Sequence, residues 1–270
     1  MSAPDTVFSG SIPEIYDRLL VPLIFEPYAL DLAGRLQAAR DILEVAAGTG
    51  VVTRALAARL SRDARIVATD LNQPMLDYAA QRLQRDHRVE WRQADALALP
   101  FAEASFDEVV CQFGAMFFPD KIKGFREALR VLCPGGRFLF NVWDRFEANH
   151  RSPLRIAARV VGSIVDRDPV SLMSPPYYDD WVIQSDLAAA GFVEIQIERV
   201  TQPSRSASAR DAATIACRGS MLRAAIETND PSRLEEVTDR VTDKLLSEFG
   251  AGSIEGTTQA LLVTAERPVS

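Results

Sequence analysis

Short apolar segments alternate with amphipathic ones over the stretch from about Asp41 to Asp144. The apolar segments are typical of buried strands, and the amphipathic segments repeat their apolar residues at helical spacing. We predict strands over 41–47, 64–70, 89–95, 106–114 and 137–144, with helices over 51–60, 72–86 and 120–132. This alternation predicts an α/β fold in which crossover helices connect the strands of a parallel sheet.

The rest of the chain has a less regular pattern. A helix over 179–192, closed by Gly191, is expected to precede a strand over 193–200, and residues 257–268 read as a last strand. Residues 204–256 are mostly helical, and Asp230 followed by Pro231 marks a helix start. No segment is rich enough in Gly, Ser or Pro to divide the chain, so we expect a single domain over 1–270.

The loop Ala46–Gly50 follows the first predicted strand, where an open parallel sheet binds its ligands. Gly48 and Gly50 allow a ligand to approach the backbone closely. A dinucleotide loop requires G-x-G-x-x-G, and here Thr53 occupies the last glycine position. Glu44 would also repel a pyrophosphate. The loop therefore favours a ligand that carries positive charge and no phosphate, such as S-adenosylmethionine.

Two further acids follow the next two predicted strands. Asp70 ends the second strand, where a carboxylate can accept hydrogen bonds from both hydroxyls of a ribose. Asp95 ends the third strand, where it can accept from the amino group of an adenine. NAD enzymes share the first feature, but they do not require the second. The combination of Glu44, Asp70 and Asp95 therefore favours S-adenosylmethionine over a dinucleotide.

Composition narrows the range of partners. The formal charge of −7 argues against nucleic acid, which needs concentrated Lys and Arg. The sequence shows no export signal and no apolar run long enough to span a bilayer, so we expect a cytoplasmic protein without stable membrane insertion. The three cysteines are scattered and the two histidines lie far apart, which predicts reduced thiols and no metal site.

The blocks "ILEVAAGTG", "ATDLNQPML", "QADALALPF" and "FDEVVCQFGAMFFPDKIKGFREALRVLCPGGRFLF" resemble, in their order and spacing, the class I S-adenosylmethionine-dependent methyltransferases, small-molecule branch. The enzymes of ubiquinone and menaquinone biosynthesis belong to that branch. The resemblance covers roughly residues 42–143. It implies a Rossmann-like, seven-stranded, mostly parallel sheet with helices on both faces and an antiparallel last strand. It also implies a helical lid over 1–40, a cofactor-binding core over 41–144, and further strands with helical substrate-side insertions over 145–270.

The same resemblance assigns the cofactor contacts. The residues that it implies are Tyr16, Glu44, Ala46, Gly48, Gly50, Asp70, Leu71, Met75, Asp95, Ala96, Gln112 and Phe113. The family usually has glycine at the position of Ala46. An alanine there would cost about 1 kcal/mol if its φ were positive, so we expect Ala46 to have a negative φ.

The sequence names no compelling catalytic base. His150 is a weak candidate, because it follows the fifth strand on the side of the sheet where the ligand is expected; a solvated loop histidine without a catalytic role is the alternative. Phe113, Phe117, Phe118 and Trp143 line an acceptor pocket, shield the sulfonium by cation–π contact, or pack in the core. Leu20–Phe25 is expected to act as a lid, and a dimer contact and a membrane-surface patch are the alternatives. Methyl transfer to a small molecule is the leading hypothesis. An NAD(P)-dependent oxidoreductase with a degenerate loop and a methyltransferase-like protein without turnover are the alternatives. The acceptor and the oligomeric state leave no signal in the sequence.

Overall fold

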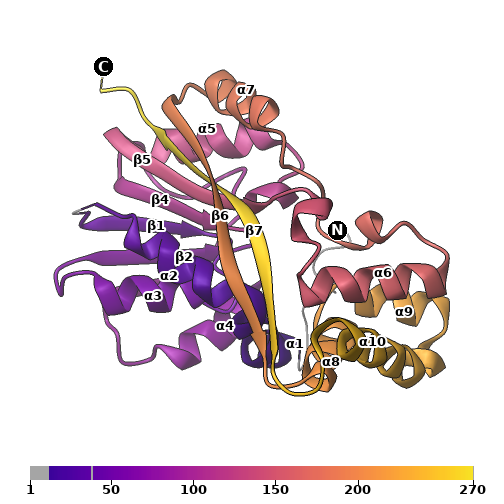
Figure 1. Cartoon of the computed structure of the whole chain (residues 1–270). Helices are drawn as coiled ribbons and strands as arrows, with labels where there is room; N and C mark the ends of the chain where they lie inside the picture. Colours follow the sequence, from indigo (N-terminus) through magenta and orange to yellow (C-terminus); the bar gives the residue numbers. More distant parts are fainter. Residues whose placement is uncertain (1–11, 38, 270) are drawn as a thin grey trace.

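The computed structural model describes residues 12–37 and 39–269, and these form a seven-stranded sheet with helices around it (Figure 1). The strand order is β3-β2-β1-β4-β5-β7-β6. The strands are β1 Asp41–Val45, β2 Arg65–Asp70, β3 Val89–Gln93, β4 Phe106–Gln112, β5 Leu132–Trp143, β6 Val193–Ser206 and β7 Ile254–Glu266. Neighbours among β1 to β5 pair in parallel, whereas β7 pairs antiparallel with both β5 and β6. The predicted fold class is confirmed.

The helices complete the fold. They are α1 Ile12–Ile15, η1 Tyr16–Phe25, α2 Glu26–Gly34, α3 Val51–Arg59, α4 Gln73–Arg82, η2 Ala115–Phe117, α5 Lys121–Val131, η3 Phe146–Asn149, α6 Pro153–Val165, η4 Pro169–Leu172, α7 Asp180–Ala190, α8 Ala209–Gly219, α9 Leu222–Asn229, η5 Pro231–Arg233 and α10 Leu234–Phe249. Helix α2 packs beside α3, and α5 packs beside α7 (Figure 1). Asn72 caps α4 as predicted, because its side chain accepts from the backbone N–H of Met75.

The central strands are buried because helices cover both faces of the sheet. Strands β1 and β4 are apolar along most of their length, which is the pattern of a parallel strand with no face open to water. Strand β3 lies at the edge and is largely exposed. The strand order reverses at β1, whose neighbours are β2 and β4. Ligands of open α/β sheets bind beyond the carboxyl ends of strands at such a reversal.

A second apolar core lies beside the sheet and joins helices that are distant in sequence. Its members include Leu20 and Ile24 of η1, Ala157 of α6, Ala213 of α8 and Val241 of α10. Figure 1 shows α6, α8, α9 and α10 at one side of the sheet, reached by the long strands β6 and β7, and these four helices are called the helical lobe. Strand β6 continues past its predicted end at residue 200 to Ser206, and β7 begins at Ile254, before its predicted start at residue 257, because these two strand ends pair with each other beyond β5.

Two expectations concern the outer parts of the chain. The expected lid over 1–40 falls partly on residues 1–11 and 38, which lie outside the described residues. Across the described residues, no helix combines the length and apolar character that a bilayer crossing requires. The division into a lid, a core and substrate-side insertions stays a prediction.

Candidate active site

A cavity of about 230 Å³ lies at the carboxyl ends of β1 and β4, between the sheet and the helical lobe. Its walls come from η1, the loop after β1, the start of α4, the loop after β4, and the lobe. The lining residues are Tyr16, Leu20, Ile24, Phe25, Glu44, Ala46, Ala47, Gly48, Thr49, Val51, Val52, Asp70, Asn72, Met75, Gln112, Phe113, Gly114, Phe117, Trp143, Leu154, Met173, Ser174, Gly219, Ser220 and Met221. The cavity therefore occupies the place that the strand order favours for a ligand.

The loop after β1 directs its backbone amides toward the protein. Ala47 N–H donates to Thr69 O at 2.9 Å, and Gly50 N–H donates to Ala47 O at 2.9 Å. Gly48 N–H donates to Asp70 Oδ2 at 2.8 Å. A phosphate-binding loop must instead keep such amides free for the anion. Because these three donors are already used, the loop is a poor cradle for a diphosphate.

Glu44 is a buried acid at the floor of this site, with 1% of its surface exposed. Its Oε2 accepts a hydrogen bond from Thr53 Oγ1 at 2.6 Å. Burial raises the pKa of Glu44 to about 8, although the Thr53 hydroxyl and Arg54 favour the charged form. Thr53 thus holds the acid from the position where a dinucleotide loop has glycine.

Asp70 stands at the end of β2, and both of its oxygens meet backbone amides. Its Oδ2 accepts from Gly48, and its Oδ1 accepts from Asn72 N–H at 2.8 Å. Burial raises the pKa of Asp70, and the amides of Asn72, Gly48 and Leu71 act in the opposite direction. A carboxylate has lone pairs for two partners on each oxygen, so both oxygens can still accept from a ribose.

Ala46 has a φ of +57°, and the expectation of a negative φ was wrong. The chain turns in the left-handed region directly after β1, where an L-residue with a Cβ is strained. The Cβ of Ala46 fills the space beside Gly114, because a Cβ on Gly114 would lie only 2.4 Å from it. The methyl group that strains the loop therefore also packs against the loop after β4.

Replacing Ala46 with glycine should raise the free energy of unfolding by up to about 1 kcal/mol, because glycine adopts a positive φ without strain. Urea unfolding followed by circular dichroism would measure the change. Ala47→Gly is the matched control, since the neighbouring Ala47 does not have a positive φ. This control should lose stability through greater freedom of the unfolded chain. Equal losses in both variants would contradict the strain at Ala46.

Three aromatic residues form part of the cavity wall. Phe113 and Trp143 stack with ring centroids 3.9 Å apart and planes inclined by 16°. Phe25 packs against both rings. Phe113 itself has a φ of +51°, which is unusual for a bulky residue. Its N–H donates to both the main-chain O and the Oδ1 of Asn141, and this pairing holds the strained residue in place.

Most of the predicted cofactor residues meet at this cavity. Those that line it are Tyr16, Glu44, Ala46, Gly48, Asp70, Met75, Gln112 and Phe113. Leu71, Asp95 and Ala96 lie outside its wall, near the adjacent ends of β2 and β3. Gly50 is the N-cap residue of α3, has a φ of +77°, and does not line the cavity. A Cβ at this position would lie only 2.9 Å from the ring of Trp91. The cofactor contacts of all twelve residues stay predictions.

The other candidates separate into two groups. Phe117 and Trp143 line the cavity, as do Leu20, Ile24 and Phe25 of the expected lid. Phe118 packs instead over Gly124 at the start of α5. His150 is exposed at the end of η3 and does not line the cavity. Its role as a base stays a prediction, and among the described residues His150 is not one of those that line the cavity.

Two polar groups of the cavity suit an amino-acid ligand, and sequence reasoning named one of them, Gln112, but missed Thr49. Thr49 Oγ1 and Gln112 Oε1 line the cavity, are buried, and have no hydrogen-bond partner among the described residues. Gln112 Nε2 donates to Phe25 O at 3.3 Å, and Gln112 Oε1 is not used in that hydrogen bond. A hydroxyl can donate to a carboxylate, and an amide oxygen can accept from an ammonium group. The donor set therefore fits the methionine part of S-adenosylmethionine. The glycine-loop motif could have indicated Thr49.

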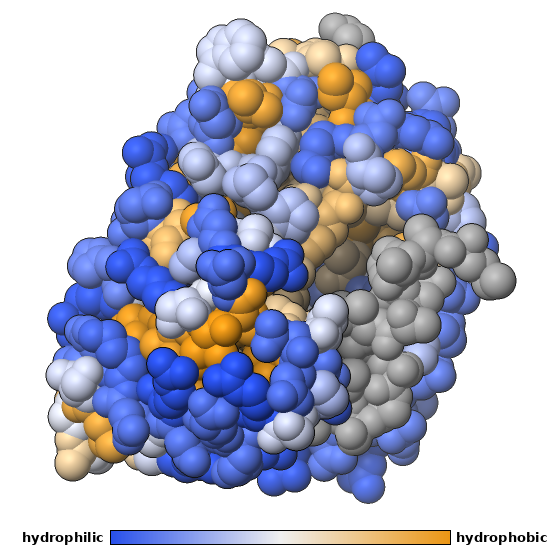
Figure 2. Space-filling model, turned by 90° about the vertical axis from the view of Figure 1, so that its right-hand side faces the viewer, coloured by the Kyte–Doolittle hydropathy of each residue, from blue (hydrophilic) through white to orange (hydrophobic). Residues whose placement is uncertain are grey.

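The part of the cavity that belongs to the lobe gave no signal in the sequence. It comprises Leu154 of α6, Met173 and Ser174 after η4, and 219–221 between α8 and α9. These positions carry no motif, and tertiary packing alone brings them to the sheet. Figure 2 shows a hollow with mostly hydrophobic walls on the face that carries the lobe.

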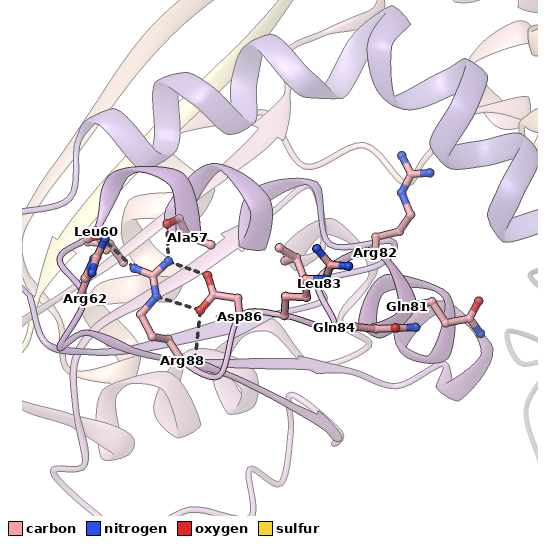
Figure 3. A pocket seen from close by; sticks show the side chains of 10 residues that line it. Ala57, Leu60, Arg62, Gln81, Arg82, Leu83, Gln84, Asp86 and Arg88 are labelled. Carbon is pink, nitrogen blue, oxygen red and sulfur yellow. Dashed lines mark hydrogen bonds and ion pairs between the residues drawn. The ribbon is translucent and has the colours of Figure 1, made fainter.

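A second hollow, of about 700 Å³, lies at the far ends of α3 and α4 (Figure 3). Arginines line it, and the most buried of them is Arg88. The guanidinium of Arg88 bonds Asp86 and the carbonyl groups of Ala57, Leu60 and Ser61. All of its nitrogens are used within the protein, so this arginine fastens the loop before β3 to the end of α3.

The fold and the site together define the class of this domain. Residues 43–140 match a family model whose description is "Methyltransferase domain". This segment is thus similar to a methyltransferase domain, and the resemblance to the S-adenosylmethionine-dependent class is confirmed.

Among curated relatives, a demethylmenaquinone methyltransferase of Clavibacter sepedonicus is 46% identical over 102 residues, which cover 38% of this chain and 40% of that protein. A ubiquinone/menaquinone biosynthesis C-methyltransferase of Idiomarina loihiensis is 36% identical over 120 residues, which cover 43% and 47%. The chain thus spans less than half the length of these two relatives.

A solved structure shows how far the fold extends beyond the matched segment. Phosphoethanolamine N-methyltransferase 2 of Haemonchus contortus, in complex with S-adenosyl-L-methionine, superposes with a TM-score of 0.60. The superposition covers 97% of this chain and 58% of that one, at 19% sequence identity. At that identity the likeness concerns the fold, and it includes the helical lobe and the last two strands.

Proposed function

We propose that this protein transfers a methyl group from S-adenosylmethionine to a small, uncharged and largely apolar acceptor. The observation that carries the proposal is the pair of acids, Glu44 and Asp70, at a loop whose amides already bond within the protein. Such a site offers a diphosphate no free loop amide, whereas a sulfonium or an ammonium group stabilises the charged form of the two acids. The matching family model and the quinone-related names of the relatives support the same activity.

The acceptor side of the cavity favours a neutral molecule. The lobe and the lid contribute Leu20, Ile24, Leu154, Met173 and Met221, and none of the described residues that line the cavity is Lys, Arg or His. An acceptor with a carboxylate or phosphate would lie near two acids without a compensating cation, which is unfavourable in a partly desolvated cavity. An aromatic or otherwise apolar ring fits these walls, in agreement with relatives named for quinone methylation.

Catalysis would depend mainly on position. Bound S-adenosylmethionine would supply a methyl group on an electrophilic sulfonium. Glu44 and Asp70 would hold the two ends of the cofactor, and the Phe113–Trp143 stack would shield the cavity from water. Alignment of reacting atoms can lower a barrier by several kcal/mol. Burial raises the pKa of Tyr16 well above its usual value, so this lining hydroxyl stays protonated and is suited to orienting an acceptor.

Calorimetric titration tests the proposal directly. S-adenosylmethionine and its demethylated product should bind, and NAD and NADP should not. Absence of binding at millimolar cofactor, or tighter binding of a dinucleotide, would overturn the proposal. Methyl transfer from a labelled cofactor should then favour neutral ring acceptors over matched acceptors that carry a carboxylate. If the protein binds the cofactor but methylates no acceptor, the alternative of a methyltransferase-like protein without catalysis would be supported.

We also infer that the reaction takes place in the cytoplasm. Three free thiols support this inference, and two of them, Cys111 and Cys217, are buried among apolar side chains. Fractionation of cells that produce the tagged protein would test it.

A further inference from the structure

One buried carboxylate fastens the segment η1 to the helices that follow β1 and β2. The side chain of Asp17 is only 2% exposed, and its Oδ1 accepts from Arg54 Nη2 of α3 at 2.7 Å. Its Oδ2 accepts from the hydroxyl of Tyr78 at 3.4 Å and lies 3.5 Å from Arg82 Nη2. Tyr78 and Arg82 belong to α4. Asp17 therefore joins η1 to two helices of the sheet domain.

The same contact continues to the glycine loop. Arg54 donates through Nη1 to Thr49 O at 2.7 Å, while Nη2 holds Asp17. A single guanidinium thus bonds both η1 and the loop on which the cofactor is proposed to lie. Its two rigid, planar bonds fix the relative position of these two segments. Movement of η1 away from the sheet must break this connection.

Segment η1 forms one wall of the cavity. Tyr16, Leu20, Ile24 and Phe25 of η1 line it, and its volume is about 230 Å³. Sites for small molecules usually measure roughly 300–1,000 Å³, and this one must take a cofactor together with an acceptor. An outward shift of η1 would widen the cavity when these molecules enter or leave.

The backbone of this segment is suited to such a shift. It is π-helical, a form that is rare and marginally stable, and it contains Pro22. Pro27 follows in the first turn of α2. Pro22 cannot donate a hydrogen bond inside η1, and Pro27 lies in the first turn of α2, where no donor is needed, so the hydrogen-bond ladder of the segment is interrupted only at Pro22.

We propose that Asp17 is a positioning residue that latches η1 over the bound cofactor and sets the rate at which the cofactor leaves. This inference rests on the proposed function for the identity of the ligand. The latch itself is a property of the free protein and is testable without a ligand. Removing one member of a buried ion pair leaves its partner uncompensated, so loss of Asp17 should favour the open segment strongly.

The first experiment measures hydrogen exchange of residues 12–25 in the free protein by mass spectrometry. Asp17→Asn should raise the exchange rate of these amides about tenfold. Glu14→Gln is the matched control, because Glu14 lies in α1 directly before η1, and its ion pair among the described residues is with the exposed Arg18. This control should exchange as the unchanged protein does. Equal exchange in Asp17→Asn and the control would overturn the latch.

The second experiment measures release of S-adenosylmethionine by stopped-flow fluorescence, since Trp143 lines the cavity. Asp17→Asn should release the cofactor at least about tenfold faster than Glu14→Gln does. A purely structural role would lower thermal stability and leave this rate unchanged, which would overturn the inference. If the unchanged protein does not bind the cofactor while exchange still rises in Asp17→Asn, the proposed function fails and the latch stands.

A milder variant keeps the test decisive if Asp17→Asn does not fold. Arg82 is about half exposed and provides the weaker of the two ion pairs of Asp17. Arg82→Gln should therefore fold and show a smaller increase in both exchange and release. Values identical to those of Glu14→Gln in both experiments would count against the latch.

Discussion

Replacing Asp70 with alanine should weaken the binding of S-adenosylmethionine at least tenfold. A hydrogen bond between a carboxylate and a hydroxyl contributes about 1.5–3 kcal/mol, and the variant loses the acceptor for the ribose. It also frees the amides of Gly48 and Asn72, which Asp70 holds in the free protein. The glycine loop should therefore become less ordered, and calorimetric titration would measure the combined loss of affinity.

Asp77→Ala provides the matched control for this experiment. Asp77 is an exposed residue of α4 and bonds only Gln73 among the described residues, so its loss removes the same charge without touching the cavity. Its affinity should equal that of the unchanged protein. Asp70→Asn should not restore binding, because its amide group would place a donor against either the Gly48 or the Asn72 N–H. Full affinity in Asp70→Asn would contradict the proposed contact.

Replacing Glu44 with glutamine should stabilise the free protein at pH 8 and weaken cofactor binding. Glu44 ionises near pH 4.5 in the unfolded chain, whereas burial raises its pKa to about 8 in the folded one. Between these values the folded protein holds a proton that the unfolded chain has lost. Unfolding therefore releases a proton, and stability falls as pH rises from about 4.5 to about 8.

Glutamine cannot ionise, so this fall should be absent in Glu44→Gln. The variant and the unchanged protein should have similar stability at pH 5, and the variant should be roughly 2–4 kcal/mol more stable at pH 8. Urea unfolding at the two pH values would measure the difference. Glu103→Gln, which changes an exposed carboxylate, should follow the unchanged protein. Parallel pH profiles for all three proteins would show that burial does not disfavour the charge of Glu44.

The same substitution should cost affinity for the cofactor, because a cation in the cavity stabilises the charged form of Glu44. Binding near pH 7 should then release up to about one proton from this site. Titration in two buffers of different ionisation enthalpy would detect the release. In Glu44→Gln the release should be smaller and the affinity at pH 8 about tenfold lower. Unchanged proton release would contradict the contact.

The sequence indicated the sheet and the acid side of the cavity, because both follow from local pattern. Glu44 and Asp70 stand at the ends of apolar strands, and strand ends in a parallel sheet meet at one edge. The order of the blocks then specified the class. The long ends of β6 and β7 were missed, since they pair beyond the sheet, where the apolar alternation stops.

The backbone conformation of the site and the residues on the acceptor side of the cavity could not be predicted from the sequence. The positive φ of Ala46 and Phe113 follows from the packing of Gly114 and from the bonds to Asn141, which no local pattern reveals. Met173 and Met221 reach the cavity only because a second core assembles helices from distant parts of the chain. Asp17 offered no motif, and its three partners come from helices that begin after the glycine loop.

The pairing of β6 with β7 has a consequence for how this architecture can diversify. Ser206 at the end of β6 is the register partner of Ile254 at the start of β7, so the two strands meet where α8, α9 and α10 are inserted. The whole excursion leaves and re-enters the sheet at one point. A different set of helices can replace α8, α9 and α10 at that junction without a change in the strand ends that carry Glu44 and Asp70. The acceptor specificity can therefore change independently of the cofactor site.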